Sequence, residues 1–163
     1  MQFPHYPHNM KSNVIKAPKR MINYPSQPLI FLAGSIEMGT AEEWQDIVSS
    51  AIENANFLNP RRDDWDSTWT QDLNNPQFYE QVSWELDMLD KADIIVMYFD
   101  PNTKSPISLL ELGLYAKSGK LIVCCPDGFW RKGNVDIVCQ RLNIPVFTSL
   151  NTLIVALKNR TEL

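Results

Sequence analysis

The chain has 163 residues, of which 44% are hydrophobic and 21% are charged, and it carries a formal net charge of −4 with an isoelectric point near 5.1. This length is typical of a single domain that can bury its own hydrophobic core. The acidic balance excludes a general surface for nucleic acid polymers or anionic membranes, because both need clustered basic residues. Small molecules are therefore the expected partners.

The three cysteines indicate the compartment. Cys124, Cys125 and Cys139 lack the spacing of a zinc site and the density of a secreted disulfide scaffold. No apolar stretch approaches the length of a membrane span, and the N-terminus lacks the apolar core of a signal peptide. The sequence therefore predicts a soluble, cytoplasmic protein with reduced thiols and with neither a metal nor a cofactor.

The first segment, residues 1–28, contains five of the eleven prolines and has no sustained helical or strand period. Such a composition predicts an irregular, Pro-rich N-terminal arm. His5 and His8 lie three residues apart on this Pro-interrupted segment. A flexible or partner-wrapping tail explains them better than a metal site.

From residue 29 onward, short apolar runs alternate with segments of helical period. The expected strands are residues 29–33, 56–58, 94–99, 121–125 and 144–147. A helix over residues 41–54 is expected to open with a capping box of Thr40 and Glu43. Alternating strands and helices imply a doubly wound α/β fold with helices on both faces of a parallel sheet. The simplest topology is flavodoxin-like, with five strands in the order 2-1-3-4-5.

Loops after the strands are expected to meet at the carboxyl edge of this sheet, where open α/β folds bind ligands. The loop of residues 33–39 offers Gly34 for close backbone approach and Ser35 near the free N–H groups of the next helix. It is too short for a dinucleotide fingerprint.

The loop of residues 59–69 concentrates two arginines, three aspartates and two tryptophans. Arg61 or Arg62 could fork onto a carbonyl or phosphate, and Trp65 or Trp69 could stack on a planar base. The alternative is a self-paired surface turn with the indoles tucked onto the sheet.

Glu111 lies in a predicted helical segment, residues 105–116, which follows the apolar run of residues 94–99. The residues three and four positions away from it on a helix are Ile107, Ser108, Leu114 and Tyr115. None of them is a cation. A carboxylate on an apolar face loses hydration without an ion partner. It is therefore either exposed at an edge or held in a pocket for chemistry.

A second carboxylate is expected from the preceding helix, residues 76–91. Val82, Leu86 and Leu89 are predicted to form its buried stripe, and Glu85 borders them. A nearby like charge would raise the pKa of one carboxyl, which gives a site both a nucleophile and a proton carrier. The alternative is an edge residue paired with a lysine. Residues 127–134 are predicted to form an ordered loop that covers the site or meets a second subunit.

Several motifs together resemble the nucleoside 2-deoxyribosyltransferase-like family over nearly all of residues 29–141. They are Phe31-Leu-Ala-Gly-Ser-Ile36, Trp84-Glu85, Leu110-Glu-Leu-Gly113 and Gly133-Asn134. The segment of residues 59–65 is similar to a less characterised branch of that family. The resemblance implies that residues 29–163 form a catalytic domain that acts on nucleosides or nucleoside monophosphates and free nucleobases.

The implied reaction is a retaining displacement at the anomeric carbon of a 2-deoxyribonucleoside. Glu111 matches the family nucleophile, which forms a covalent deoxyribosyl intermediate until another base arrives. Glu85 stands where the family usually has an aspartate that contacts the base and helps to move its proton. Asn134 matches an asparagine that the family lends across a subunit interface to the sugar hydroxyls, so a homo-oligomer is expected.

Besides Glu85, two further positions depart from the transferase pattern. Phe31 stands where some transferases have a tyrosine that hydrogen-bonds the nucleophile. Ser105 stands where transferases often have an aspartate, whereas related 2-deoxynucleoside 5-monophosphate N-hydrolases have a serine, which removes a charge that would repel phosphate. The expected substrate-binding residues are Phe31, Gly34, Ser35, Arg61, Asp64, Trp65, Ser105 and Asn134.

Base exchange between deoxynucleosides is the first functional expectation. Its alternatives are hydrolysis of the N-glycosidic bond of a nucleotide and a noncatalytic nucleotide-binding module. A flavin protein of the same topology is poorly supported, because no loop has the run of Ser, Thr and Gly that cradles a phosphate.

Overall fold

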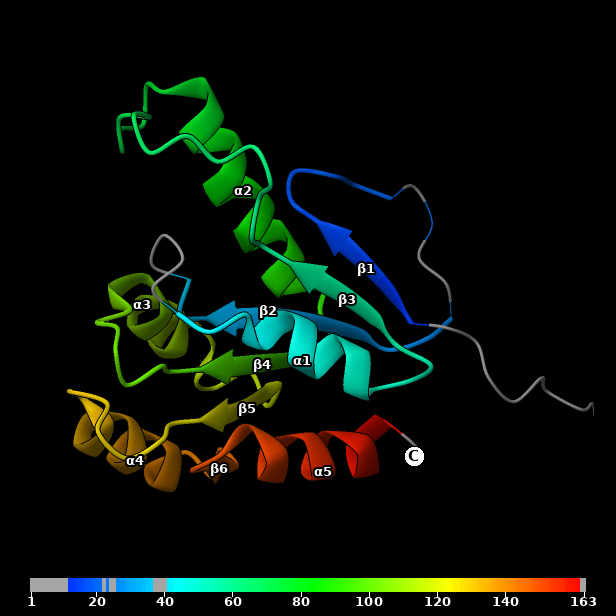
Figure 1. Ribbon diagram of the computed structural model, residues 1–163, viewed down its shortest axis with the longest axis vertical. Helices are drawn as coiled ribbons and strands as arrows, with labels where there is room; N and C mark the ends of the chain where they lie inside the picture. The colour runs from blue at the N-terminus through cyan, green and yellow to red at the C-terminus, as the bar shows by residue number, and fades with distance from the viewer. Residues whose placement is uncertain (1–11, 22, 24–25, 37–40, 162–163) are drawn as a thin grey trace, which may run out of the picture.

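The computed structural model describes residues 12–21, 23, 26–36 and 41–161. Within these residues, six strands form one parallel sheet in the order β1-β3-β2-β4-β5-β6 (Figure 1). The strands are β1 Asn13–Lys16, β2 Leu29–Gly34, β3 Asn56–Asn59, β4 Ile94–Tyr98, β5 Leu121–Cys124 and β6 Val146–Phe147. The helices are α1 Trp44–Ala51, α2 Pro76–Lys91, α3 Pro106–Tyr115, α4 Lys132–Arg141 and α5 Leu150–Thr161.

Strand alternation places the core on both faces of the sheet. On β2, Phe31 and Ala33 point toward α2, α3 and α4, whereas Ile30 and Leu32 point toward α1 and α5. Phe31 packs against Trp84 of α2 with ring centroids 6.1 Å apart. The prediction of a flavodoxin-like α/β fold with helices on both faces is confirmed.

The sheet differs from the prediction in having a sixth strand. β1 lies within the segment predicted to be irregular, and it pairs in parallel with β3. Ile15 is buried while Val14 is 45% exposed, so only one side chain of the strand enters the core. A strand this short has too little hydrophobic pattern to stand out among neighbouring prolines. Part of the predicted arm therefore belongs to the sheet, whereas His5 and His8 lie outside the described residues.

Three helix predictions need correction. α1 begins only at Trp44, and its N-cap Glu43 makes no side-chain capping bond, while Thr40 lies outside the described residues. α4 begins at Lys132, inside the segment predicted to be a loop. On α2, Leu86 is 40% exposed, and the buried face consists of Gln81, Trp84, Met88 and Leu89. The predicted stripe is therefore right for Leu89, which is buried, and wrong for Leu86, because the buried face is rotated toward Gln81 and Trp84.

Candidate active site

Two helices bring a pair of carboxyl groups to the carboxyl edge of the sheet. Asn75 caps α2 by accepting hydrogen bonds from the backbone N–H groups of Gln77 and Phe78, and Pro76 suits the first turn. α3 begins with Pro106 after Ser105, whose φ of 47° places it in the left-handed region. Glu111 on α3 is only 8% exposed, and Glu85 on α2 is partly buried.

These two carboxyl groups influence each other. Burial and the negative charge of Glu85 raise the pKa of Glu111 to about 8. Burial also raises the pKa of Glu85 to about 7, against the lowering effect of a hydrogen bond from Gln81. Near neutral pH the pair therefore keeps protons that isolated glutamates would have lost, and Glu111, with the higher pKa, holds its proton more tightly. The two carboxyl groups singled out from the sequence thus lie close enough to interact, and burial is the main cause of the raised pKa of each.

Gln81 is a site residue that sequence reasoning missed. It lies one helical turn before Glu85 and is 4% exposed. Its Nε2 donates to Glu85 Oε1 at 2.7 Å and to the backbone oxygen of Pro60 at 2.8 Å. The available signal was its spacing of four residues from Glu85, which places both side chains on one face of the helix.

A cluster of three buried hydroxyl groups lies between the ends of β2 and β4 and the start of α3. Ser35 Oγ lies 2.8 Å from Thr103 Oγ1 and 2.5 Å from Ser105 Oγ, and Thr103 Oγ1 lies 2.8 Å from Ser105 Oγ. Ser35 Oγ also accepts from the backbone N–H of Asp100. The structure thus brings the predicted Ser35 and Ser105 together and adds Thr103, which the sequence did not single out.

The packing of this fold requires a glycine at position 34. Its φ is 136°, and a Cβ there would lie 2.3 Å from the backbone oxygen of Tyr98 and 2.7 Å from its nitrogen. A side chain would separate the ends of β2 and β4. The close approach that the sequence predicts is therefore made by the neighbouring strand.

Arg61 follows β3 and has free hydrogen-bonding capacity. Its Nη1 lies 3.5 Å from Glu43 Oε1, whereas its Nε and Nη2 are buried with no hydrogen-bond partner. Buried donors of this kind normally pair with protein, water or a ligand. Two donors of the guanidinium group thus remain available for a planar or anionic acceptor.

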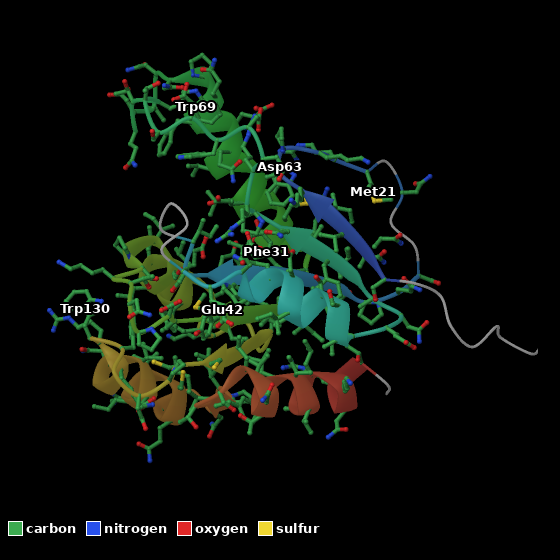
Figure 2. All side chains as sticks on the ribbon, viewed as in Figure 1. Met21, Phe31, Glu42, Asp63, Trp69 and Trp130 are labelled. Atoms are coloured by element: carbon green, nitrogen blue, oxygen red, sulfur yellow. The ribbon has the colours of Figure 1, made fainter. Side chains whose placement is uncertain are left out.

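The remainder of the loop after β3 is paired with itself and with α2. Arg62 donates to both carboxylate oxygens of Asp64 at 2.8 and 3.1 Å, which lowers the pKa of Asp64. Arg62 also lies over the ring of Trp69, and Trp69 packs edge-to-face against Trp65. Trp69 lies at the outer end of α2 (Figure 2). Asp64 and Trp65 are thus engaged within the loop, which agrees with the alternative prediction of a self-paired turn. The two indoles pack against each other at the outer end of α2, however, and not onto the sheet as that alternative expected.

The remaining predicted site residues have different surroundings. Phe31 is fully buried against Trp84, so it forms part of the core between β2 and α2. Asn134 is exposed in the first turn of α4. Just before α4, Trp130 Nε1 donates to the backbone oxygen of Lys104 at 2.9 Å, which ties that segment to the loop before α3 (Figure 2).

Other parts of the described chain contain fewer groups that could react or bind a ligand. A hollow of about 300 Å³ lies near the amino edge of β5. Lys117 is the one ionisable residue among those that line it, so neither Glu111 nor Glu85 lies in this hollow. Cys124, Cys125 and Cys139 are free and buried, and burial raises the pKa of each thiol. Within the described ranges, no cluster of His, Cys, Asp and Glu could hold a metal ion. None of the helices found there has both the length and the apolar character needed to cross a membrane.

The fold and the site define a flavodoxin-like α/β protein in which a buried and a partly buried carboxyl group interact at the carboxyl edge of the sheet, where open α/β folds bind ligands. Residues 27–129 match the family described as nucleoside 2-deoxyribosyltransferase like, and the chain belongs to this family. The predicted resemblance is thereby confirmed.

Comparison with solved structures gives a similar fold. A crystal structure of a conserved protein from Enterococcus faecalis V583 matches with a TM-score of 0.59 and 15% sequence identity. The match covers 83% of this chain and 99% of that chain. Identity at this level shows the shared fold alone. A comparison with curated proteins finds no match.

Proposed function

We propose that this protein transfers a 2-deoxyribosyl group between nucleobases through a covalent intermediate on Glu111. The observation that carries the proposal is the buried Glu111 and Glu85 pair in a member of this family. A pair of carboxyl groups whose pKa values are both raised toward neutral pH can supply one ionised carboxylate and one acid. These are the two groups that a retaining displacement at a glycosidic carbon needs.

In the first step, a Glu111 oxygen bonds to the anomeric carbon, and the bond from that carbon to the base nitrogen breaks. The bonding electrons leave with the base, which takes a proton from Glu85. The developing positive charge on the sugar favours the ionised form of Glu111, so the proton of the pair belongs on Glu85 at this stage. In the second step, a nitrogen of another base attacks the same carbon, the bond between that carbon and the Glu111 oxygen breaks, and the bonding electrons return to the Glu111 carboxylate. The attacking base gives its proton to Glu85. Two inversions retain the original configuration.

The low exposure of Glu111 supports transfer over hydrolysis, because a covalent intermediate must survive until the acceptor base binds. Hydrolysis of a 2-deoxynucleoside 5-monophosphate is the second candidate. It is favoured by the neutral Ser105 and by the unpaired Nε and Nη2 donors of Arg61. A phosphate group would be repelled by an aspartate at position 105 and attracted by a guanidinium group.

Incubating the protein with a 2-deoxynucleoside and a different free base tests the proposal. We expect a new nucleoside, separated by chromatography, and little free deoxyribose. The same assay with a 5-phosphorylated donor measures whether phosphate accelerates or blocks base release. Free sugar without a new nucleoside would support hydrolysis. Ligand-induced stabilisation without release of any base would support a noncatalytic binding module and contradict both enzymatic readings.

We also propose a homo-oligomer that uses α3. Ile107, Leu110 and Leu114 are each 59% exposed and lie along one face of the helix that carries Glu111. A second subunit on this face would remove apolar surface from water next to the site. The proposal that a partner subunit's Asn134 reaches the sugar hydroxyls depends on such an assembly.

Replacing Leu110 with aspartate is expected to weaken this association, because a charge would be buried at the interface. Sedimentation velocity should then give a mass closer to the 18.8 kDa of one chain. Val155 on α5 is 61% exposed and serves as the matched control, since Val155→Asp places the same charge on another helix. Equal masses for both variants and the wild type would argue against α3 as the interface.

A further inference from the structure

Gln81 has an unusual bonding pattern for a buried amide. Both hydrogens of its Nε2 are used, one toward Glu85 Oε1 at 2.7 Å and one toward the Pro60 backbone oxygen at 2.8 Å. Its Oε1 is buried and has no hydrogen-bond partner. An orphaned amide oxygen in a buried position calls for a compensating reason.

The Pro60 carbonyl fixes which end of the amide faces Glu85. A backbone carbonyl can only accept a hydrogen bond, so Nε2 must face it. The second hydrogen on the same nitrogen then points to Glu85 Oε1. Turning the amide over would place Oε1 against the carbonyl and the carboxylate, where two acceptors repel. Glu85 Oε1 is therefore always an acceptor in this arrangement, and a proton taken up by Glu85 is placed on Oε2.

We propose that Gln81 is a positioning residue, which orients the Glu85 carboxyl through the Pro60 carbonyl and makes Oε2 the oxygen that carries the transferred proton. The inference rests on the proposed function, since it assigns Glu85 a proton to carry. It also explains why Gln81 Oε1 has no hydrogen-bond partner. The orientation that lets Nε2 donate to both Glu85 and Pro60 leaves Oε1 without a donor.

The surroundings of Glu85 support this role. Glu111 faces it from α3 with like charge, the loop after β3 presents the neutral Pro60 carbonyl, and Gln81 donates from its own helix. Burial raises the pKa of Glu85 to about 7, and the Gln81 hydrogen bond lowers it. Without that hydrogen bond, the pKa of Glu85 would rise further from neutral pH, where a carboxyl group accepts and releases a proton most readily.

Carboxyl ¹³C NMR titration of Gln81→Met tests the proposal without any need for turnover. Methionine keeps a similar volume and helix propensity but has no N–H donor. We expect the Glu85 titration to move upward by about one pH unit, the size expected for loss of one hydrogen bond to a charged group. Gln45→Met is the matched control: Gln45 is a buried amide on α1 with no hydrogen-bond partner, so its loss should leave Glu85 unchanged.

The direction in which the titration midpoint of Glu85 moves distinguishes a positioning role of Gln81 from a purely structural role. A variant that merely loosens the structure would expose Glu85 and move its titration downward, toward the ordinary value of 4.5. An unchanged or lowered midpoint in Gln81→Met would overturn the proposal.

A second measurement uses the wild-type protein and does not depend on a variant that folds. The side-chain ¹⁵N resonance of Gln81 should shift with pH at the same midpoint as the Glu85 carboxyl, because the two groups share a hydrogen bond. An amide resonance that ignores the Glu85 titration would equally overturn the proposal. If the titrations behave as expected but no substrate is turned over, the proposed function fails and the hydrogen-bond arrangement stands.

Discussion

Glu111→Ala is expected to abolish base release, with a loss of about 10⁴-fold or more, the scale seen when a catalytic nucleophile is removed. The physical reason is that no other carboxylate is placed on α3 to bond to the sugar carbon. Glu111→Gln should lose activity to a similar extent, because the neutral amide keeps the shape of the side chain but is a poor nucleophile. Chromatography of released base, with and without an acceptor, measures the effect.

The covalent intermediate gives this prediction an independent readout. Mass spectrometry of the wild-type protein mixed with donor alone should detect a species heavier by one deoxyribosyl group, which disappears when acceptor base is added. Glu53→Gln is the matched control, because Glu53 is an exposed carboxylate just beyond α1. Undiminished turnover by Glu111→Ala would remove the basis of the enzymatic proposal.

The second large effect concerns stability and pH. The raised pKa values of Glu111, about 8, and Glu85, about 7, mean that the folded protein keeps protons that the unfolded chain has lost above its ordinary value of 4.5. Because the folded state binds more protons in this window, the free energy of unfolding should fall as the pH rises from about 5 to about 8. Acidification across the same window should stabilise the protein with respect to these two groups.

Glu111→Gln should remove much of that pH dependence. At about pH 5 the variant and the wild type should be similar, because the carboxyl is protonated when folded and little charge is lost. At about pH 8 the variant should be more stable by on the order of 2–4 kcal/mol, since no buried charge has to form. Urea unfolding at the two pH values, followed by circular dichroism, measures the difference. Parallel pH profiles for the two proteins would mean that Glu111 is more hydrated than its 8% exposure indicates.

These two effects have opposite signs, which makes them informative together. A residue kept only for stability should not destabilise the protein at neutral pH. A carboxyl that weakens the fold and is required for turnover fits the general observation that functional sites hold groups in unfavourable surroundings.

Predicted elements and observed elements agree best where hydrophobic patterns are long. The strand predictions around β2, β4 and β5 were correct to within about one residue, because each is an apolar run buried on both faces. β6 is shorter than predicted and begins at Val146. β1 was not predicted, because an edge strand needs few apolar residues. Its partner strand β3 also lies over forty residues away in the chain.

The sequence by itself determined the class of fold and the family, because periodicity and short motifs are local properties of the chain. It also singled out Glu111 as the candidate nucleophile, because a carboxylate without a neighbouring cation on an apolar helix is a local feature as well. Tertiary structure alone decided which side chains meet. It joined Gln81 to Glu85 and Pro60, grouped Thr103 with Ser35 and Ser105, and paired Arg62 with Asp64 and Trp69. The contacts of Ser35 with Thr103 and Ser105, and of Gln81 with Pro60, join segments far apart in the chain, which no local pattern specifies. The contacts of Gln81 with Glu85 and of Arg62 with Asp64 are local in the chain, but the packing of the surrounding segments decides which partner each side chain takes.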